Sequence, residues 1–216
     1  MPRIYVACLA SYNNGRLHGA WIDCDGKDAD DIQREVNQML RTSPYPNVMR
    51  RQCIDCEYIQ DDRGADDTCD ECRGELSPAF PSAEEYAIHD HEGFSNLIGE
   101  STSFEDVALI AAALDGDNAM AFKWLISDIG MSAADAADKA DEVCIWEDDR
   151  GQWDETMLAE YAEKFANDCY DLREIPETFR NYIDWEAMGR DMRAGGDITL
   201  AEIDGRRFIV TNPSEF

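Results

Sequence analysis

The sequence predicts an α+β protein of three small domains, and three observations support this class. Short segments near both ends have the composition of strands, the middle third has apolar residues at helical spacing, and a cysteine-bearing stretch shows no apolar periodicity. We expect an N-terminal α+β domain at 1–98, a central helical domain at 99–142 and a C-terminal α+β domain at 143–216. The cysteine-bearing module is inserted in the first domain, at about 46–80.

The N-terminal domain begins with strand-like sequence. Residues 3–10 form a short apolar segment, and the Asn-Asn-Gly of 13–15 supplies turn chemistry, because Asn and Gly tolerate positive φ. Residues 17–22 are then expected to pair back as a second strand. Apolar residues recur on one face of a predicted amphipathic helix over 28–41.

The rest of the chain is mostly helical. Ser82 and Glu85 have the spacing of a helix-capping box before a short helix or strand at 86–94. Ser103 and Ser132 are predicted helix N-caps. Further expected elements are helices at 104–114, 118–129, 133–143, 155–170 and 185–192, a short apolar piece at 143–146, a short helix around Phe179, and a β-hairpin of 198–203 with 207–210.

The net charge excludes whole classes of partner. The chain has 47 acidic and 19 basic residues among 216, a formal net charge of −28. Such a surface repels the phosphates of nucleic acids and anionic membranes, and a conventional DNA or RNA binder needs a basic footprint. The excess is uneven, since residues 81–160 hold 20 acids and 3 bases. One region is therefore expected to present an acidic face.

No apolar run approaches a membrane span of roughly 18 residues, and no apolar signal segment precedes the first strand. We therefore expect a cytoplasmic protein. The cytosol keeps thiols reduced, so the eight cysteines are interpreted as thiols or metal ligands rather than disulfides.

The strongest local motif is Cys53-x2-Cys56-x12-Cys69-x2-Cys72. Two Cys-x2-Cys turns can each supply two thiolates to a tetrahedral Zn²⁺. The alternatives are four unrelated thiols or a pair of redox dithiols. Because the surrounding segment lacks a core, we predict one structural Zn²⁺ per chain, with no ligand position open for a substrate. The other cysteines, Cys8, Cys24, Cys144 and Cys169, are interpreted as small core residues.

Little in the sequence indicates an enzyme. His89 and His91 could form a metal pair or a base, but a polar strand or turn is the preferred interpretation. The common hydrolase, metalloprotease and phosphate-loop motifs are absent from the sequence. No catalytic residue is predicted, and a metal-dependent hydrolase is the least favoured alternative.

The predicted helix over 133–143 carries acids about one turn apart, namely Asp135, Asp138 and Asp141, with Glu142 beside the last. At 1.5 Å rise per residue these carboxylates are about 4.5 Å apart along the axis. Phosphates of a DNA strand are about 3.4 Å apart along the duplex axis. The helix face is thus either a crude copy of a phosphate row or simply a solvated face. Further acids that could extend such a surface are Glu147, Asp148, Asp149, Asp154 and Glu155.

Several segments resemble the ArdA family of antirestriction proteins. These are Arg3-Ile4-Tyr5-Val6-Ala7, Tyr12-Asn13-x-Gly15-Arg16, His18-Gly19-x-Trp21-Ile22-Asp23, Glu84-Glu85-Tyr86-Ala87-Ile88-His89-Asp90-x-Glu92-Gly93-Phe94 and Tyr182-Ile183-Asp184-Trp185-Glu186. The resemblance covers 1–45 and 82–195, and its fourth segment is fairly specific. The cysteine module and the tail after Gly195 lie outside it.

The resemblance implies a protein of mobile genetic elements, acting in the bacterial cytoplasm, that mimics bent B-form DNA. Members occupy the DNA-binding groove of type I restriction–modification enzymes, as elongated two-fold dimers of three-domain subunits. We therefore expect inhibition of DNA cleavage, and whether methylation is also blocked is left open. Phe179, Tyr182 and Trp185 are candidates for the homodimer interface. The competing hypothesis is an acidic zinc-ribbon adaptor that binds other proteins.

Overall fold

The computed structural model describes residues 1–64, 68–147 and 154–216, and it confirms the mixed α+β class. The chain divides into two compact units, Met1–Gly116 and Asp117–Phe216. The division into three domains stays a prediction. Within the described residues, none of the helices combines the length and the apolar character that crossing a bilayer requires.

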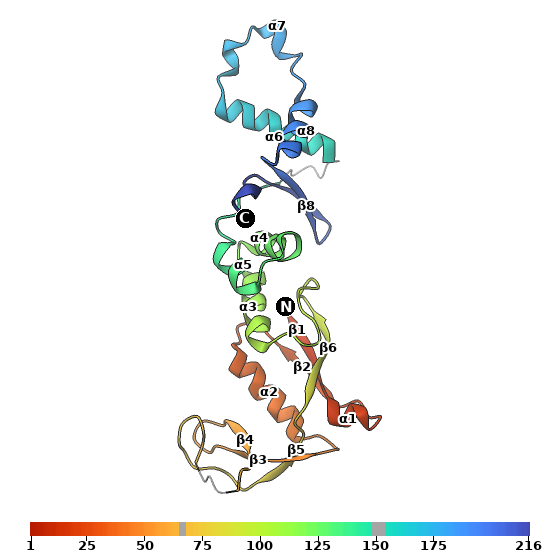
Figure 1. Cartoon of the computed structure of the whole chain (residues 1–216), viewed down its shortest axis with the longest axis vertical. Helices are drawn as coiled ribbons and strands as arrows, with labels where there is room; N and C mark the ends of the chain where they lie inside the picture. The colour runs from red at the N-terminus through yellow and green to blue at the C-terminus, as the bar shows by residue number, and fades with distance from the viewer. Residues whose placement is uncertain (65–67, 148–153) are drawn as a thin grey trace. The chain divides into compact units, whose positions relative to one another are not determined.

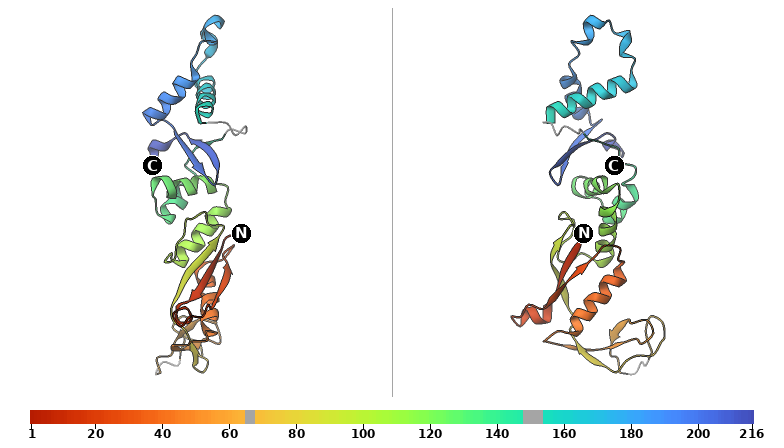
Figure 2. Two further views of the ribbon diagram at one scale, coloured as in Figure 1. Left: turned by 90° about the vertical axis from the view of Figure 1, so that its right-hand side faces the viewer. Right: turned by 180° about the vertical axis from the view of Figure 1, so that it is seen from behind.

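The first unit contains two antiparallel three-stranded sheets, ordered β2-β1-β6 and β4-β3-β5. Its elements are β1 (Arg3–Cys8), α1 (Leu9–Asn13), β2 (Gly19–Asp23), α2 (Ala29–Arg41), β3 (Val48–Gln52), β4 (Ile59–Asp61), β5 (Phe80–Ser82), β6 (Tyr86–Glu92) and α3 (Phe104–Asp115). Helix α2 lies along the sheet that contains β1 and β2, and α3 contacts α2 (Figures 1 and 2).

Burial of alternate residues explains this packing. Ile4 and Val6 of β1 are fully buried, and so are Ile32 and Val36 of α2. Each such side chain contributes roughly 1.5–3 kcal/mol when it leaves water. Asp28 begins the helix, because its carboxylate accepts a hydrogen bond from the Asp31 amide at 2.8 Å. The first strand, second strand and helix predicted from the sequence are thus confirmed, but Leu9 and Ala10, expected at the end of the first strand, begin α1 instead.

The second sheet carries the cysteine module, and the two ends of the module meet. The amide of Asn47 donates to the carbonyl of Ser82 at 2.9 Å, and Val48 pairs with Ser82. The guanidinium of Arg41 lies over the Phe80 ring, 4.1 Å from its centroid. The module therefore leaves and rejoins the rest of the first unit at nearly one point.

The second unit contains an antiparallel sheet ordered β7-β9-β8 and several helices. Its elements are α4 (Ala119–Trp124), a π-helical turn (Leu125–Ile129), α5 (Ala133–Lys139), β7 (Ile145–Trp146), α6 (Asp154–Cys169), a 3₁₀ turn (Leu172–Glu174), α7 (Glu177–Arg180), α8 (Trp185–Gly195), β8 (Thr199–Ile203), β9 (Arg206–Val210) and a final 3₁₀ turn (Pro213–Glu215). The predicted hairpin is confirmed, and its Asp204 and Gly205 have φ of 52° and 75°.

Helices α6 and α8 lie side by side, as both figures show. Gly189 permits this contact, because a Cβ there would stand 2.5 Å from the Leu158 carbonyl oxygen. Leu158 belongs to a buried cluster with Met157, Ile198 and Ile209. The sheet and the two helices of the second unit therefore share one apolar core.

Two predicted helical features are wrong. Ser82 does not cap a helix, since it ends β5, and the following Ala83 amide donates to the Leu40 carbonyl at 3.1 Å. Helix α5 starts at Ser132 as predicted but ends at Lys139, not at residue 143. Asn212 explains the early end: its side chain donates to the Glu142 carbonyl and accepts from the Cys144 amide, at 2.9 and 2.8 Å. These long-range bonds draw the chain into β7.

Candidate metal centre and acidic surface

The two Cys-x2-Cys turns fold in nearly the same way. The amide of Glu57 donates to the Cys53 carbonyl at 3.2 Å, and the amide of Arg73 donates to the Cys69 carbonyl at 3.0 Å. Glu57 and Arg73, each directly after the second cysteine of its turn, have φ of 62° and 65°. One backbone geometry thus presents both pairs of sulfur atoms.

A second pair of hydrogen bonds closes each turn. The Cys53 amide donates to the Tyr58 carbonyl at 2.8 Å, and the Cys69 amide donates to the Gly74 carbonyl at 2.9 Å. Gly74 has a further role, because a Cβ at this position would lie 2.1 Å from the Asp55 carboxylate and 3.1 Å from the Cys53 sulfur. A larger residue here would force the Asp55 carboxylate to move and would crowd the Cys53 sulfur.

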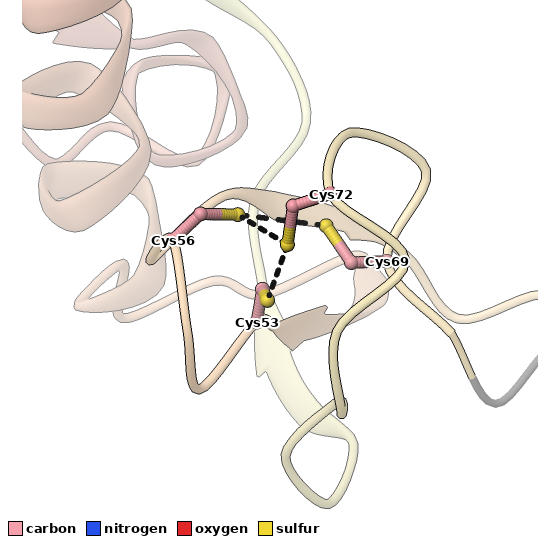
Figure 3. Close-up of side chains that lie close together, drawn as sticks. All are labelled: Cys53, Cys56, Cys69 and Cys72. Carbon is pink, nitrogen blue, oxygen red and sulfur yellow. Dashed lines mark hydrogen bonds between the residues drawn. The ribbon is translucent and has the colours of Figure 1, made fainter.

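The four sulfur atoms converge on one point, as Figure 3 shows. All four Sγ atoms of Cys53, Cys56, Cys69 and Cys72 lie within 4.8 Å of one another. Three of the separations are 3.3, 3.5 and 3.6 Å. A Zn²⁺ with Zn–S bonds of about 2.3 Å needs tetrahedral edges of about 3.8 Å. The donor set and its spacing therefore fit a tetrahedral thiolate site.

These sulfur contacts argue against two separate dithiols. The short contacts join Cys53 to Cys72 and Cys56 to both Cys69 and Cys72, so each links one turn to the other. Two independent redox dithiols would need no such contacts between the turns. Hydrogen bonds from the Cys56 and Asp55 amides lower the pKa of Cys53 to about 7, whereas hydrogen bonds with neighbouring sulfurs help to raise the pKa of Cys56 and Cys72. Cys53 is therefore the first of these three thiols to form the thiolate that binds metals.

The remaining cysteines differ from the prediction in part. Cys8 and Cys24 are buried, as expected, and burial raises the pKa of the Cys24 thiol to about 11. Cys144 and Cys169 are exposed, so their interpretation as core residues is wrong. Cys169 is the last residue of α6, and Cys144 lies just before the short β7, so both stand at the surface.

The histidines occupy a polar strand, in line with the preferred interpretation. His89 and His91 lie on β6 (Tyr86–Glu92), where the rings of His89 and Tyr12 meet edge to face with centroids 5.0 Å apart. Among the described residues, the four cysteines are the one group of three or more His, Cys, Asp or Glu side chains close enough to share a metal ion.

The acidic candidates on and after α5 are all exposed to solvent. Asp135 and Asp138 lie on the helix, and Asp135 also accepts from the Ser132 hydroxyl at 2.7 Å. Asp141 and Glu142 lie in the turn that follows, so the predicted single helical row is interrupted. That the spacing of these four carboxylates copies the spacing of DNA phosphates stays a prediction.

The other acidic candidates have different surroundings. Glu147 is bound by Arg206, whose guanidinium approaches its carboxylate to 2.7 Å, and this long-range pair was missed because no local pattern reveals it. Glu155 is exposed near the start of α6. Asp148 and Asp149 lie outside the described residues, and the side chain of Asp154 is not described either.

The predicted interface residues are available for contact. The side chains of Phe179 and Tyr182 are 63% and 82% exposed, and Trp185 is half-buried at the start of α8. Large aromatic side chains that stand in solvent are common at interfaces. Whether a second subunit covers them stays a prediction.

Comparison with known protein families gives a match over nearly the whole chain. A family model described as "Antirestriction protein (ArdA)" matches residues 4–204. A search of curated proteins finds no match. The matched range runs across the cysteine module and continues past the end of the sequence resemblance at residue 195.

Proposed function

The chain belongs to the ArdA family of antirestriction proteins, and from this membership we propose that it is a DNA mimic that occupies the DNA-binding groove of type I restriction–modification enzymes. The family match is the observation that carries the proposal. The net charge of −28 supports it, because a groove built for DNA is lined with cations that attract carboxylates as they attract phosphates. Inhibition of cleavage requires no chemistry from the inhibitor.

The amount of charge matches the proposed role. A homodimer, which we propose as the active form, carries a formal charge of about −56. At one charge per about 1.7 Å of duplex, this charge equals that of roughly 95 Å of DNA. Carboxylates fixed on a folded scaffold gain the same attraction to the groove as DNA. The inhibitor should therefore compete with DNA of any sequence.

We further propose that the cysteine cluster holds one structural Zn²⁺. Cys53, Cys56, Cys69 and Cys72 would be its ligands, and the ion would join two turns that otherwise share a small apolar cluster of Cys53, Cys69 and Leu76. With four thiolates bound, the ion has no position for a substrate. Its contribution is to the fold of the module.

A reconstituted reaction tests the proposal. A purified type I restriction–modification enzyme is mixed with unmethylated DNA, ATP and increasing amounts of the protein, and both cleavage and methyl transfer are measured. We expect inhibition that is relieved by added DNA and that weakens with salt, since exposed charges are screened over about 10 Å at 0.1 M. An enzyme that cleaves normally at saturating protein would contradict the proposal.

Chelation separates this function from that of a zinc-dependent adaptor. After removal of the metal, a charge mimic keeps most of its inhibition provided that the rest of the scaffold stays folded. An adaptor whose zinc module is the binding part loses its activity together with the metal. Circular dichroism and thermal unfolding of the metal-free protein provide the control for the scaffold.

A further inference from the structure

One face of the first sheet carries an ordered set of aromatic and charged side chains. The strand register aligns two rows across β6, β1 and β2: Asp90 with Tyr5 and Trp21, and Glu92 with Arg3 and Asp23. Directly paired residues share one face of a sheet, and neighbours along a strand alternate between faces. The opposite face holds the buried Ile4, Val6 and Ile22, which pack toward α2. The two rows therefore lie on the face that α2 leaves uncovered.

The first row contains an exposed aromatic pair. The rings of Tyr5 and Trp21 lie with centroids 5.6 Å apart and planes tilted by 56°. The Trp21 side chain is 40% exposed, and Asp90, which pairs with Tyr5, is exposed as well. A large aromatic ring next to carboxylates attracts a cation by two mechanisms at once.

A guanidinium of the protein itself already uses this arrangement. The Arg3 guanidinium lies over the Trp21 ring, 4.6 Å from its centroid. The same group approaches the Glu92 carboxylate to 2.6 Å and donates from Nε to it at 2.7 Å. Ring and carboxylate are thus spaced so that a single guanidinium can stack on one and bind the other.

We propose that this face binds an arginine side chain of the restriction enzyme in place of Arg3. The indole stands in for a nucleobase and the carboxylates for its neighbouring phosphates. Arginine is favoured over lysine because its planar group stacks on rings while it donates to oxygen atoms. The inference rests on the proposed function, and it adds an aromatic contact to what would otherwise be attraction between charges alone.

The charge of the two rows is complementary to such a partner. Three carboxylates, of Asp23, Asp90 and Glu92, face one cation, Arg3. An incoming arginine that displaces Arg3 from the ring keeps the stacking and adds a positive charge to the face. Arg3 thus acts as an internal competitor that occupies the site until the partner arrives.

Removal of the competitor gives the sharpest test. Arg3→Ala uncovers Trp21 and releases Glu92, and we expect inhibition of the type I enzyme to tighten by about threefold, as for a cation–π contact at an exposed site. The matched control is Arg16→Ala, which removes an equal charge from an exposed position of the same unit. Tightening that is equal in both variants would overturn the inference, because it reflects net charge alone.

Loss of the ring and of the carboxylates should have the opposite effect. We expect Trp21→Ala to weaken inhibition about fivefold and Trp21→Phe to weaken it less, because phenyl rings bind cations less well. Asp23→Asn, Asp90→Asn and Glu92→Gln combined should weaken inhibition more than Glu84→Gln, Glu85→Gln and Glu100→Gln combined. The control triple removes the same charge at exposed positions off the two rows. Thermal unfolding verifies that each variant is folded.

A direct binding measurement keeps the inference separate from the proposed function. Hexa-arginine peptide is titrated into the ¹⁵N-labelled protein, and hexa-lysine peptide is the control. The Trp21 indole resonance, identified by its loss in Trp21→Phe, should shift more with arginine than with lysine. If the parent inhibits the enzyme but Trp21→Ala does so equally, the inference fails and the proposed function stands. If the parent does not inhibit, the proposed function fails, and an unshifted indole resonance would also overturn the inference.

Discussion

At the residue scale, the placement of each sulfur depends on its neighbours. Glu57 and Arg73 adopt positive φ, and Gly74 leaves room for Asp55 and the Cys53 sulfur. The four-cysteine spacing was sufficient to predict that these sulfurs would converge. The closing hydrogen bonds were not predictable, because the residues that follow the two cysteine pairs, Glu57-Tyr58 and Arg73-Gly74, share no sequence pattern.

Cys69→Ser should abolish stable zinc binding. The Cys69 side chain is fully buried among the sulfurs, and a hydroxyl is a poor substitute for a thiolate ligand. We expect elemental analysis to give about one zinc per parent chain and far less for the variant, with the remaining module thiols open to alkylation. Cys144→Ser is the control, because this exposed cysteine lies outside the cluster and its loss should leave the zinc content unchanged. A parent protein purified without zinc would refute the prediction.

Gly189→Ala should destabilise the second unit. The new Cβ would meet the backbone of Leu158 at 2.5 Å, and a backbone atom cannot rotate away as a side chain can. We expect a loss of roughly 1–3 kcal/mol in the free energy of unfolding, the usual cost of overpacking. Urea denaturation measures it. Gly195→Ala on the same helix meets only a carboxylate oxygen at 3.5 Å and serves as the tolerated control.

At the element scale, local patterns predicted helices well and their ends less well. Ser103 and Ser132 cap α3 and α5 as expected, each accepting from the amide three residues later at 3.1 Å. The end of α5 was missed because Asn212, far away in sequence, fixes the chain after Lys139. The apparent capping box at Ser82 failed for a similar reason, since pairing with Val48 holds Ser82 in a strand.

Replacing residues 48–81 with a short Gly-Ser turn should leave the first sheet folded. The amide of Asn47 already reaches the carbonyl of Ser82, so the new turn has almost no gap to close. We expect loss of zinc and a modest loss of stability, because Phe80 no longer contacts Arg41. Backbone chemical shifts of β1, β2 and β6 provide the measurement. Collapse of these resonances to those of an unfolded chain would show that the module is required for the fold.

The acidic segment around α5 should act through many weak contacts. An exposed carboxylate that meets a Lys or Arg contributes roughly 0.2–1 kcal/mol, so Asp138→Asn alone should hardly change inhibition. Neutralising Asp135, Asp138, Asp141 and Glu142 together should cost more, and the difference should shrink as salt is raised. Inhibition curves of both variants over a salt series measure this. Equal inhibition by the quadruple variant and the parent would remove this segment from the mimicking surface.

At the scale of the whole molecule, net charge and family resemblance indicate the class of protein, which no single residue does. The excess of acids predicted from composition alone that the chain is not a nucleic-acid binder, and this stays a prediction. The resemblance identified the family that the family model over 4–204 then confirmed. The packing inside each unit could not be predicted in this way. It depends on contacts between distant segments, such as the packing of α2 on α3, which leave no periodic signal.

The protein is expected to be a homodimer of about 49 kDa, twice the chain mass of 24.4 kDa. Phe179 and Tyr182 are too exposed for residues of a monomer core, and an acidic chain needs apolar contacts to bring two copies together. Light scattering at micromolar concentration measures the mass. Phe179→Ser with Tyr182→Ser should shift it toward the monomer, and Tyr12→Ser, an exposed tyrosine of the first unit, should not. A parent mass near 24 kDa would contradict the prediction.

The meeting of Asn47 and Ser82 has an evolutionary consequence. A segment whose ends lie one hydrogen bond apart can be gained or lost in a single genetic insertion or deletion while the flanking strands keep their pairing. The proposed zinc site would also order the segment by itself, so the segment would need few contacts with the rest of the first unit. Its sequence is then free to diverge faster than that of the sheet to which it is attached. An alignment of relatives should accordingly show length changes concentrated between these two residues.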